Sequence, residues 1–210
     1  MKTILHVQSS PRGDESFSIR AAREFLAAVG KKHPEAKVQT LDLFSADIPS
    51  FTAPQAEAKY AVMAGEAPRD EAGRAWKRVI RVIDQFKSAE LIVLSAPMWN
   101  FSIPYRLKDY IDVIVQPGLT FAYSPEKGYS GLVSGRPAVL ILARGGDYSP
   151  GSGGEAFDMQ KPYLEAILRF MGFSDVRTIV IQPTLMSGPE AAGRKLHEAV
   201  AAAKALAAEL

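Results

Sequence analysis

The chain has 210 residues, 47% of them hydrophobic, which suffices for one hydrophobic core and is short for two domains. It contains no cysteine, which excludes disulfides, iron–sulfur clusters, cysteine zinc sites and cysteine nucleophiles. The net charge of +2 gives no sign of a nucleic-acid-binding face, and no apolar run is long enough for a signal peptide or a membrane span, so we expect a cytoplasmic protein.

Strand patterns alternate with helix patterns along the whole chain. Strands are predicted at 2–7, 36–43, 90–96, 135–144 and 175–183. Helices are predicted at 16–32, 54–64, 71–89, 103–115, 157–173 and 188–210. The alternation predicts a single α/β domain over residues 1–210, with a five-stranded parallel sheet covered on both faces. Right-handed crossovers favour the strand order 2-1-3-4-5 of a flavodoxin-like three-layer sandwich.

Three unusual loops follow the first, third and fourth predicted strands. They read "SSPRGDESFS" (9–18), "PMWNFSIP" (97–104) and "ARGGDYSPGSGG" (143–154). Ligands of doubly wound sheets bind beyond the carboxyl ends of the strands, near the point where the strand order reverses. Because these three strands are neighbours in the predicted order, we expect the loops to converge on one ligand site.

The first loop is rich in hydroxyl groups and lacks both the G-x-G-x-x-G and the G-x-x-x-x-G-K-[ST] pattern. A helix that begins near Ser16 offers unpaired N–H groups and the positive end of its dipole, which attract an anion. Ser10, Ser16 and Ser18 add hydroxyl donors, a set that suits a terminal phosphomonoester. The alternative is that Ser16 only caps the helix and the other serines are turn residues.

The second loop places Met98, Trp99 and Phe101 at a strand end, where large apolar side chains favour a flat apolar ligand. Asn100 adds an amide that can both donate and accept, as the polar edge of a heterocycle requires. The alternative is a hydrophobic plug that closes the end of the sheet.

The third loop supplies Gly145 and Gly146, whose bare backbone lets N–H groups approach a ring closely. Arg144 either has a structural role or lines the site. The alternative for the whole segment is an ordinary glycine-rich turn.

No side chain pattern indicates a metal centre or a catalytic acid or base. The three histidines, His6, His33 and His197, share no metal-ligand spacing. The chain also lacks a G-x-S-x-G elbow, an H-E-x-x-H motif and a pattern of paired carboxylates. We therefore predict no metal ligand and no catalytic side chain.

Taken together, "SS" (9–10), "SFS" (16–18), "PMWNFSIP" (97–104), "GLTF" (118–121) and "ARGG" (143–146) resemble the FMN-dependent NADH azoreductase family, also described as NAD(P)H:quinone oxidoreductases. The resemblance extends over essentially the whole chain. Ala143 stands where that family often has Ser, so one hydroxyl near the flavin is missing.

The resemblance implies a flavodoxin-like homodimer with one FMN per subunit. It assigns the phosphate to Ser10, Ser16, Phe17 and Ser18. It assigns the isoalloxazine ring to two short segments, whose residues are Met98, Trp99, Asn100, Phe101, Ala143, Arg144, Gly145 and Gly146.

The implied activity is transfer of two electrons from NADH or NADPH, through the flavin, to quinones and azo compounds by a ping-pong mechanism. Phe121, Tyr123 and Tyr129 are candidate walls of the substrate slot, in the same or the neighbouring subunit, with ordinary loop packing as the alternative. A flavodoxin-type electron carrier, an acyl-carrier-protein phosphodiesterase-type hydrolase and a regulatory module remain as other readings of the same fold.

Overall fold

A five-stranded parallel sheet forms the centre of the computed structural model, which describes all 210 residues. Its strands run in the order β2-β1-β3-β6-β7, which confirms the predicted order 2-1-3-4-5. The strands are β1 (Thr3–Gln8), β2 (Lys37–Asp42), β3 (Leu91–Pro97), β6 (Pro137–Ala143) and β7 (Asp175–Ile181).

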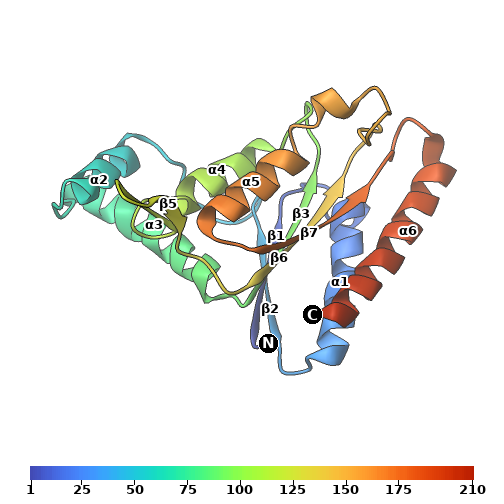
Figure 1. The fold of residues 1–210 in the computed structure, drawn as a ribbon, viewed down its shortest axis with the longest axis horizontal. Coiled ribbons are helices and arrows are strands. Elements are labelled where there is room, and N and C mark those ends of the chain that lie inside the picture. Colours follow the sequence, from blue (N-terminus) through green and yellow to red (C-terminus); the bar gives the residue numbers. More distant parts are fainter.

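Helices cover both faces of this sheet (Figure 1). One face carries α1 (Phe17–Lys32) and α6 (Gly188–Glu209), which pack on each other. The other carries α3 (Asp70–Ser88), α4 (Tyr105–Ile114) and α5 (Lys161–Met171), while α2 (Ala53–Met63) packs against α3 at the periphery. None of these helices has the length and apolar character that crossing a membrane requires.

The three inner strands, β1, β3 and β6, are buried on both faces, as their continuous apolar runs require, whereas the edge strand β2 is mostly exposed. In β3, Leu91 and Val93 face the core beneath α1 and α6, whereas Ile92 and Leu94 face the core beneath α3, α4 and α5. Because successive side chains of a strand point to opposite faces of the sheet, the single strand β3 contributes side chains to both cores. Both cores lie along the strands and leave the loops at the carboxyl ends free to bind ligands.

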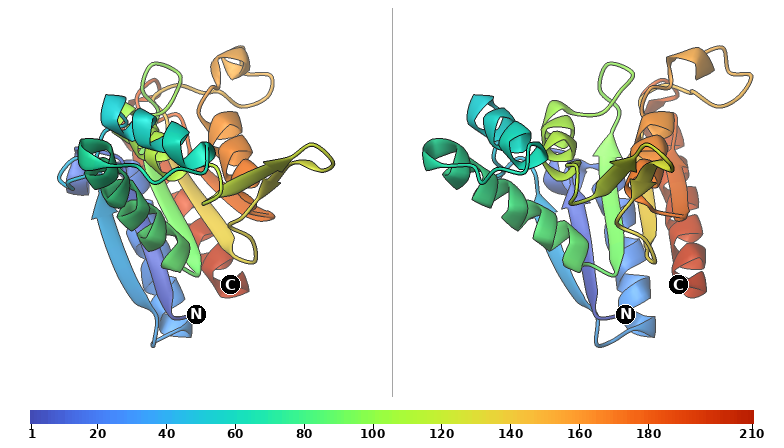
Figure 2. Two further views of the ribbon diagram at one scale, coloured as in Figure 1. Left: turned by 90° about the vertical axis from the view of Figure 1, so that its left-hand side faces the viewer. Right: turned by 60° about the vertical axis from the view of Figure 1, so that its left-hand side comes forward.

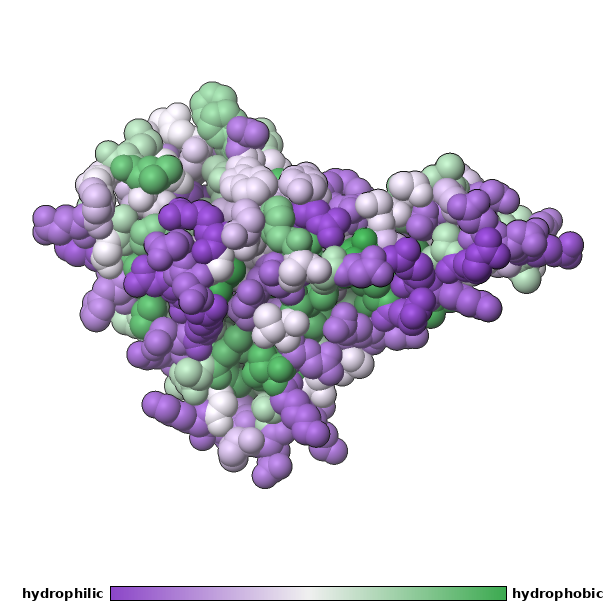
Figure 3. All heavy atoms as spheres, turned by 180° about the vertical axis from the view of Figure 1, so that it is seen from behind, coloured by the Kyte–Doolittle hydropathy of each residue, from purple (hydrophilic) through white to green (hydrophobic).

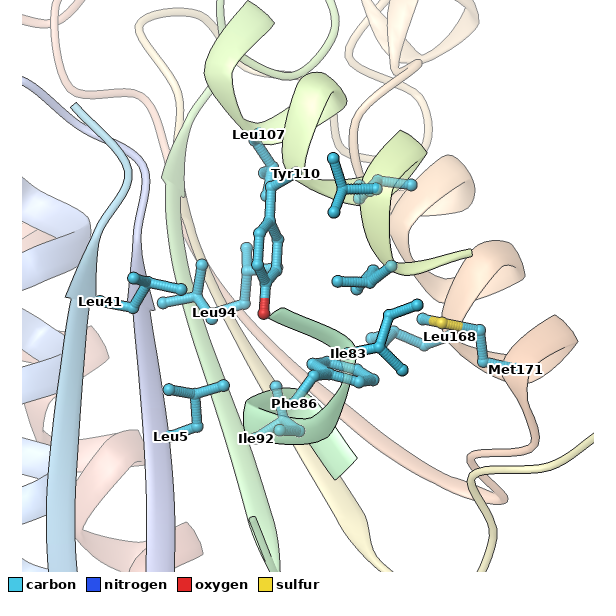
Figure 4. Packing of buried hydrophobic residues seen from close by; sticks show 14 of the residues in the cluster. Leu5, Leu41, Ile83, Phe86, Ile92, Leu94, Leu107, Tyr110, Leu168 and Met171 are labelled. Atoms are coloured by element: carbon cyan, nitrogen blue, oxygen red, sulfur yellow. The ribbon is translucent and has the colours of Figure 1, made fainter. Parts of the chain in front are cut away.

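Tyr110 of α4 lies in the centre of the larger core, with its ring edge-on to Phe86 at 6.4 Å between centroids. Figure 4 shows its hydroxyl group pointing away from α4 into the apolar side chains. The hydroxyl has no hydrogen-bond partner, and burial raises its pKa above the ordinary value.

We expect Tyr110→Phe to raise the free energy of unfolding by about 1 kcal/mol, because it removes a buried hydroxyl group that makes no hydrogen bond. Denaturant unfolding of the two proteins measures the difference. Tyr110→Leu serves as the control, since it also removes the ring and should destabilise the core. A loss of stability in Tyr110→Phe would contradict the prediction.

A short antiparallel hairpin, β4 (Phe121–Ser124) and β5 (Gly128–Gly131), was not predicted. It projects from the body of the molecule (Figure 2). Its four-residue strands carry too few apolar residues to show an alternating pattern. Tertiary contact holds it in place: Gly131 lies so close to α5 that a Cβ atom there would come within 2.2 Å of the Gly172 backbone nitrogen.

The predicted start of the fifth helix at residue 157 was wrong. Glu155–Phe157 form a 3-10 turn, and α5 begins only at Lys161. The cause is Asp158, whose Oδ1 accepts the N–H groups of Gln160 and Lys161, both at 3.1 Å. The predicted end is confirmed, because Gly172 terminates α5 in the left-handed conformation at φ 111°.

Candidate functional site

The three loops converge at the carboxyl ends of β1, β3 and β6. The Ser9 N–H donates to the Ser95 carbonyl at 3.0 Å, and the Met98 N–H donates to the Ala143 carbonyl at 2.8 Å. Between the loops lies a cleft of ≈ 200 Å³. Its lining residues are Ser10, Arg12, Ser16, Phe17, Pro97, Met98, Trp99, Ala143, Gly145, Thr184 and Leu185.

The serine end of the cleft is the amino terminus of α1. Ser16 is the N-cap of α1, and its Oγ accepts the Ile19 N–H at 3.5 Å. Ser16 also lines the cleft, together with Ser10 and Phe17. Ser18 lies deeper: it is fully buried and its Oγ lies 3.1 Å from the Ser16 Oγ. The hydroxyl groups and the helix terminus thus gather at one end.

Arg12 is a cleft residue that sequence reasoning missed. It is exposed, lines the cleft and forms no ion pair, whereas nearby Arg23 pairs with Asp14. Its position between Ser10 and Ser16 was the available signal. It is the one charged side chain that lines the cleft, so the serine end is positive in sign.

The second loop is a tight turn in which Trp99 and Ser102 exchange two backbone hydrogen bonds of 2.9 Å. Asn100 and Phe101, at its tip, have φ values of 47° and 67°, a conformation that costs free energy for residues other than glycine. Met98 and Trp99 line the cleft, but Asn100 and Phe101 do not. Phe101 instead stacks on Phe157, with 5.0 Å between the ring centroids.

The third loop contributes backbone to the cleft. Ala143 and Gly145 line it, whereas Gly146 does not. Neither Gly145 nor Gly146 donates its N–H to an acceptor within the protein. Two backbone donors are therefore available beside the cleft.

Arg144 turns its side chain away from the cleft into the body of the loop. Its guanidinium lies 2.9 Å from Asp158 Oδ2 and donates to Gln160 Oε1 at 3.0 Å and to Gln182 Oε1 at 3.3 Å. Burial lowers its pKa, and the Asp158 carboxylate opposes that shift. Arg144 therefore has the structural role that was one of the two readings of the sequence.

A fourth loop, between β7 and α6, also reaches the cleft and was not predicted as part of the site. The Thr184 N–H donates to the Arg144 carbonyl at 2.8 Å, and the Leu185 N–H donates to the Gly145 carbonyl at 3.1 Å. Thr184 and Leu185 line the cleft as a result. The predicted strand order could have placed this loop at the site, because it makes the fifth predicted strand a neighbour of the fourth.

The aromatic residues of the hairpin lie apart from this cleft. Phe121 and Tyr129 pack on Phe170 of α5, with ring centroids 4.7 Å and 5.5 Å away, and Tyr123 packs on Tyr129 at 5.0 Å. Tyr123 and Tyr129 remain largely exposed. The fold of one chain therefore does not bring these candidate slot residues into its own cleft.

His6 lies on β1, buried on the α1 side of the sheet. Its Nε2 lies 3.0 Å from the Ser95 Oγ, and its Nδ1 lies 3.3 Å from the Gln8 Nε2. Burial, with a smaller contribution from the Arg23 charge, lowers the pKa of His6 from 6.5 to about 4. The lowered pKa favours the neutral imidazole in the folded protein at pH 7.

Lowering the pH from 7 to 5 should reduce the free energy of unfolding by about 2 kcal/mol through His6, because only the unfolded chain binds the proton in this range. This stability is present above the unfolded pKa and is lost as the pH falls toward the folded one. Denaturant unfolding at both pH values measures it. His6→Gln should lose this part of the pH dependence, whereas a His197→Gln control on the surface of α6 should keep it.

Comparisons with known proteins agree with this geometry. The model of a family described as having a flavodoxin-like fold matches residues 2–207. The chain is 47% identical to an FMN-dependent NADH:quinone oxidoreductase of Nitratidesulfovibrio vulgaris over 100% of both chains. It is 42% identical to FMN-dependent NADH:quinone oxidoreductase 1 of Bradyrhizobium diazoefficiens over 94% of this chain and 98% of that one.

Solved structures show the same similarity. An azoreductase from Bacillus anthracis covers 100% of both chains with a TM-score of 0.91 and 28% identity. An FMN-dependent NADH-azoreductase from Bacillus anthracis, solved in complex with FMN, covers 99% of this chain and 100% of its own with a TM-score of 0.86 and 28% identity.

Proposed function

Because the chain belongs to the flavodoxin-like fold family, we propose that it is an FMN-dependent NADH:quinone oxidoreductase that also reduces aromatic azo compounds. The observation that supports this most is the cleft, in which a helix terminus with serines at one end meets apolar side chains at the other. We assign the whole chain, residues 1–210, to one FMN-binding domain.

The residues present fit FMN. Ser10, Ser16 and the first N–H groups of α1 suit a phosphate group, and Arg12 adds a cation beside them. At the other end, Gly145 leaves room that a side chain would take up, since a Cβ atom there would lie 2.9 Å from Leu185 Cδ1. Met98 supplies an apolar surface for a ring system.

Chemistry, rather than size, identifies this cleft. A larger hollow of ≈ 500 Å³ lies between α1 and α6, but it is lined by charged residues such as Arg20, Arg23 and Glu24. Such a lining does not suit a planar apolar ring.

Bound FMN would supply the redox chemistry, taking a hydride from NADH and passing two electrons on to a quinone or azo compound. The chain's own groups hold and shield it. Ser10 and Ser16 would hold the phosphate, and Met98 and Trp99 would exclude water from the ring. The N–H groups of Gly145 and Gly146, which have no acceptor within the protein, would stabilise negative charge on the ring. No side chain is needed as an acid or base. A single apolar slot shared by NADH and acceptor favours ping-pong kinetics.

We further propose that the protein works as a homodimer in the cytoplasm. The exposed aromatic residues Tyr123 and Tyr129 on the projecting hairpin support the dimer, because exposed aromatic clusters are typical of protein interfaces. In the dimer, the hairpin aromatics Phe121, Tyr123 and Tyr129 would complete the substrate slot of the second subunit. Light scattering should give twice the chain mass, and Tyr123→Ser with Tyr129→Ser should shift it toward the monomer.

The absorption spectrum of the purified protein tests the proposed activity. We expect a flavin spectrum, or its appearance after reconstitution with FMN, followed by bleaching with NADH without oxygen and recovery on adding benzoquinone. The uncharged dye 4-dimethylaminoazobenzene serves as the azo substrate. A colourless protein that cannot be reconstituted would contradict the assignment, and a flavin that NADH does not bleach would indicate an electron carrier.

A further inference from the structure

Thr184 and Leu185 form one side of the cleft, and neither they nor the adjacent Met186 have a role in the mechanism above. β6 lies between β3 and β7 in the sheet, so the loops after β3 and β7 flank Gly145 from opposite sides. Trp99 of one loop and Leu185 of the other both line the cleft. The cleft is thus a slot with bare backbone at its base and an apolar side chain on each side.

Hydrogen bonds hold the backbone of this segment firmly. The Thr184 Oγ1 donates to the Arg144 carbonyl at 2.9 Å, and the N–H groups of Leu185 and Met186 both donate to the Gly145 carbonyl at 3.1 Å. Arg144 is itself fixed by its ion pair with Asp158. The backbone position of Leu185 is therefore set before any ligand arrives, which lowers the cost of binding.

The side chains of this rigid segment nevertheless face solvent. Leu185 is 75% exposed and Met186 is 79% exposed, the two highest values among the large apolar residues of the chain. In Figure 3, apolar residues appear among the loops at the upper left, whereas the arm formed by α2 and α3 is mainly hydrophilic. Exposed apolar side chains at the rim of a cleft indicate a ligand surface.

We propose that Leu185 is a specificity-determining residue that packs on the ring of the electron acceptor and selects planar, uncharged acceptors. This inference rests on the proposed function. The charge distribution supports this proposal. The charged residue of the cleft, Arg12, lies at the serine end, whereas Leu185 lies at the Gly145 end, where no charged side chain lines the cleft. A charged substituent packed against Leu185 would lose the part of its hydration that faces the side chain, without gaining a partner.

Two naphthoquinones test the proposal on the FMN-loaded enzyme: uncharged menadione and 1,2-naphthoquinone-4-sulfonate. Leu185→Ala should raise the KM for menadione about tenfold with little change in kcat, because a few lost methyl contacts have about this effect. Leu185→Lys should reverse the preference in favour of the sulfonate. Val38→Ala is the matched control, since Val38 is 43% exposed on β2 at the opposite edge of the sheet.

Menadione binding to the oxidised, FMN-loaded protein without NADH gives a second readout that needs no turnover. Its Kd should rise about tenfold in Leu185→Ala and stay unchanged in Val38→Ala. Unchanged values for both quinones in both Leu185 variants would overturn the proposal. So would weaker FMN binding with an unaltered response to the quinones, because Leu185 would then contact the cofactor instead. If the wild-type protein binds menadione but does not oxidise NADH, the proposed function fails, while the binding comparison still decides whether Leu185 recognises the ring.

Discussion

Asp158→Ala should lower the free energy of unfolding by about 3–5 kcal/mol, because it leaves the buried Arg144 guanidinium without its carboxylate. The side chain of Arg144 is 2% exposed and that of Asp158 is 12% exposed, so water screens the pair little. The substitution also removes the acceptor for two N–H groups at the start of α5. Denaturant unfolding at pH 7 measures the loss.

Two further variants separate the ion pair from the loss of side-chain bulk. Asp112→Ala breaks the exposed pair with Lys108 and should cost less than about 0.5 kcal/mol. The double variant Arg144→Met with Asp158→Ala should lose less unfolding free energy than the two single variants lose in sum. The reason is that the double variant leaves no unpaired charge. A loss of under about 1 kcal/mol in Asp158→Ala would show that the pair does not hold the loop.

Replacing Ser10 and Ser16 by alanine should weaken FMN binding by about 100-fold or more, because each hydroxyl hydrogen bond to a charged group contributes about 1.5–3 kcal/mol. Riboflavin, which has no phosphate, should bind to the variant almost as well as to the wild type. Quenching of flavin fluorescence on titration of the apoprotein measures both affinities. A loss of affinity for FMN that is much larger than the loss for riboflavin would identify the serine end of the cleft as the phosphate site.

Ser9→Ala is the control for that experiment. Ser9 is buried in the same loop, but its Oγ donates to the Ser95 carbonyl at 3.2 Å and does not line the cleft. The control should lose stability and keep its affinity for FMN. Equal losses of FMN and riboflavin affinity in the Ser10 and Ser16 variant would place the phosphate elsewhere.

Substitution of Arg12 by Gln should, in addition, reduce the salt dependence of FMN binding.

The sheet could be predicted because each strand is marked by a pattern within its own stretch of sequence. Apolar runs such as 90–96 stand between polar helix ends, and right-handed crossovers leave few possible strand orders. The strand order brings three loops that are distant in sequence to the carboxyl end of the sheet, so the sequence alone places Ser10, Ser16, Met98 and Gly145 together, and all four line the cleft. Capping chemistry likewise located the start of α1 at Ser16.

Tertiary structure alone decided where side chains of the site point. Arg144 lies among predicted ligand residues, yet its guanidinium turns inward because Asp158 and Gln182, 14 and 38 residues away along the chain, offer it partners there. Leu185 reaches the cleft for the same reason, since its N–H finds an acceptor at Gly145. Periodicity and composition indicate which residues are buried and on which element they lie. The direction in which a polar side chain points depends on its hydrogen-bond partners, and only the folded chain brings those partners within reach.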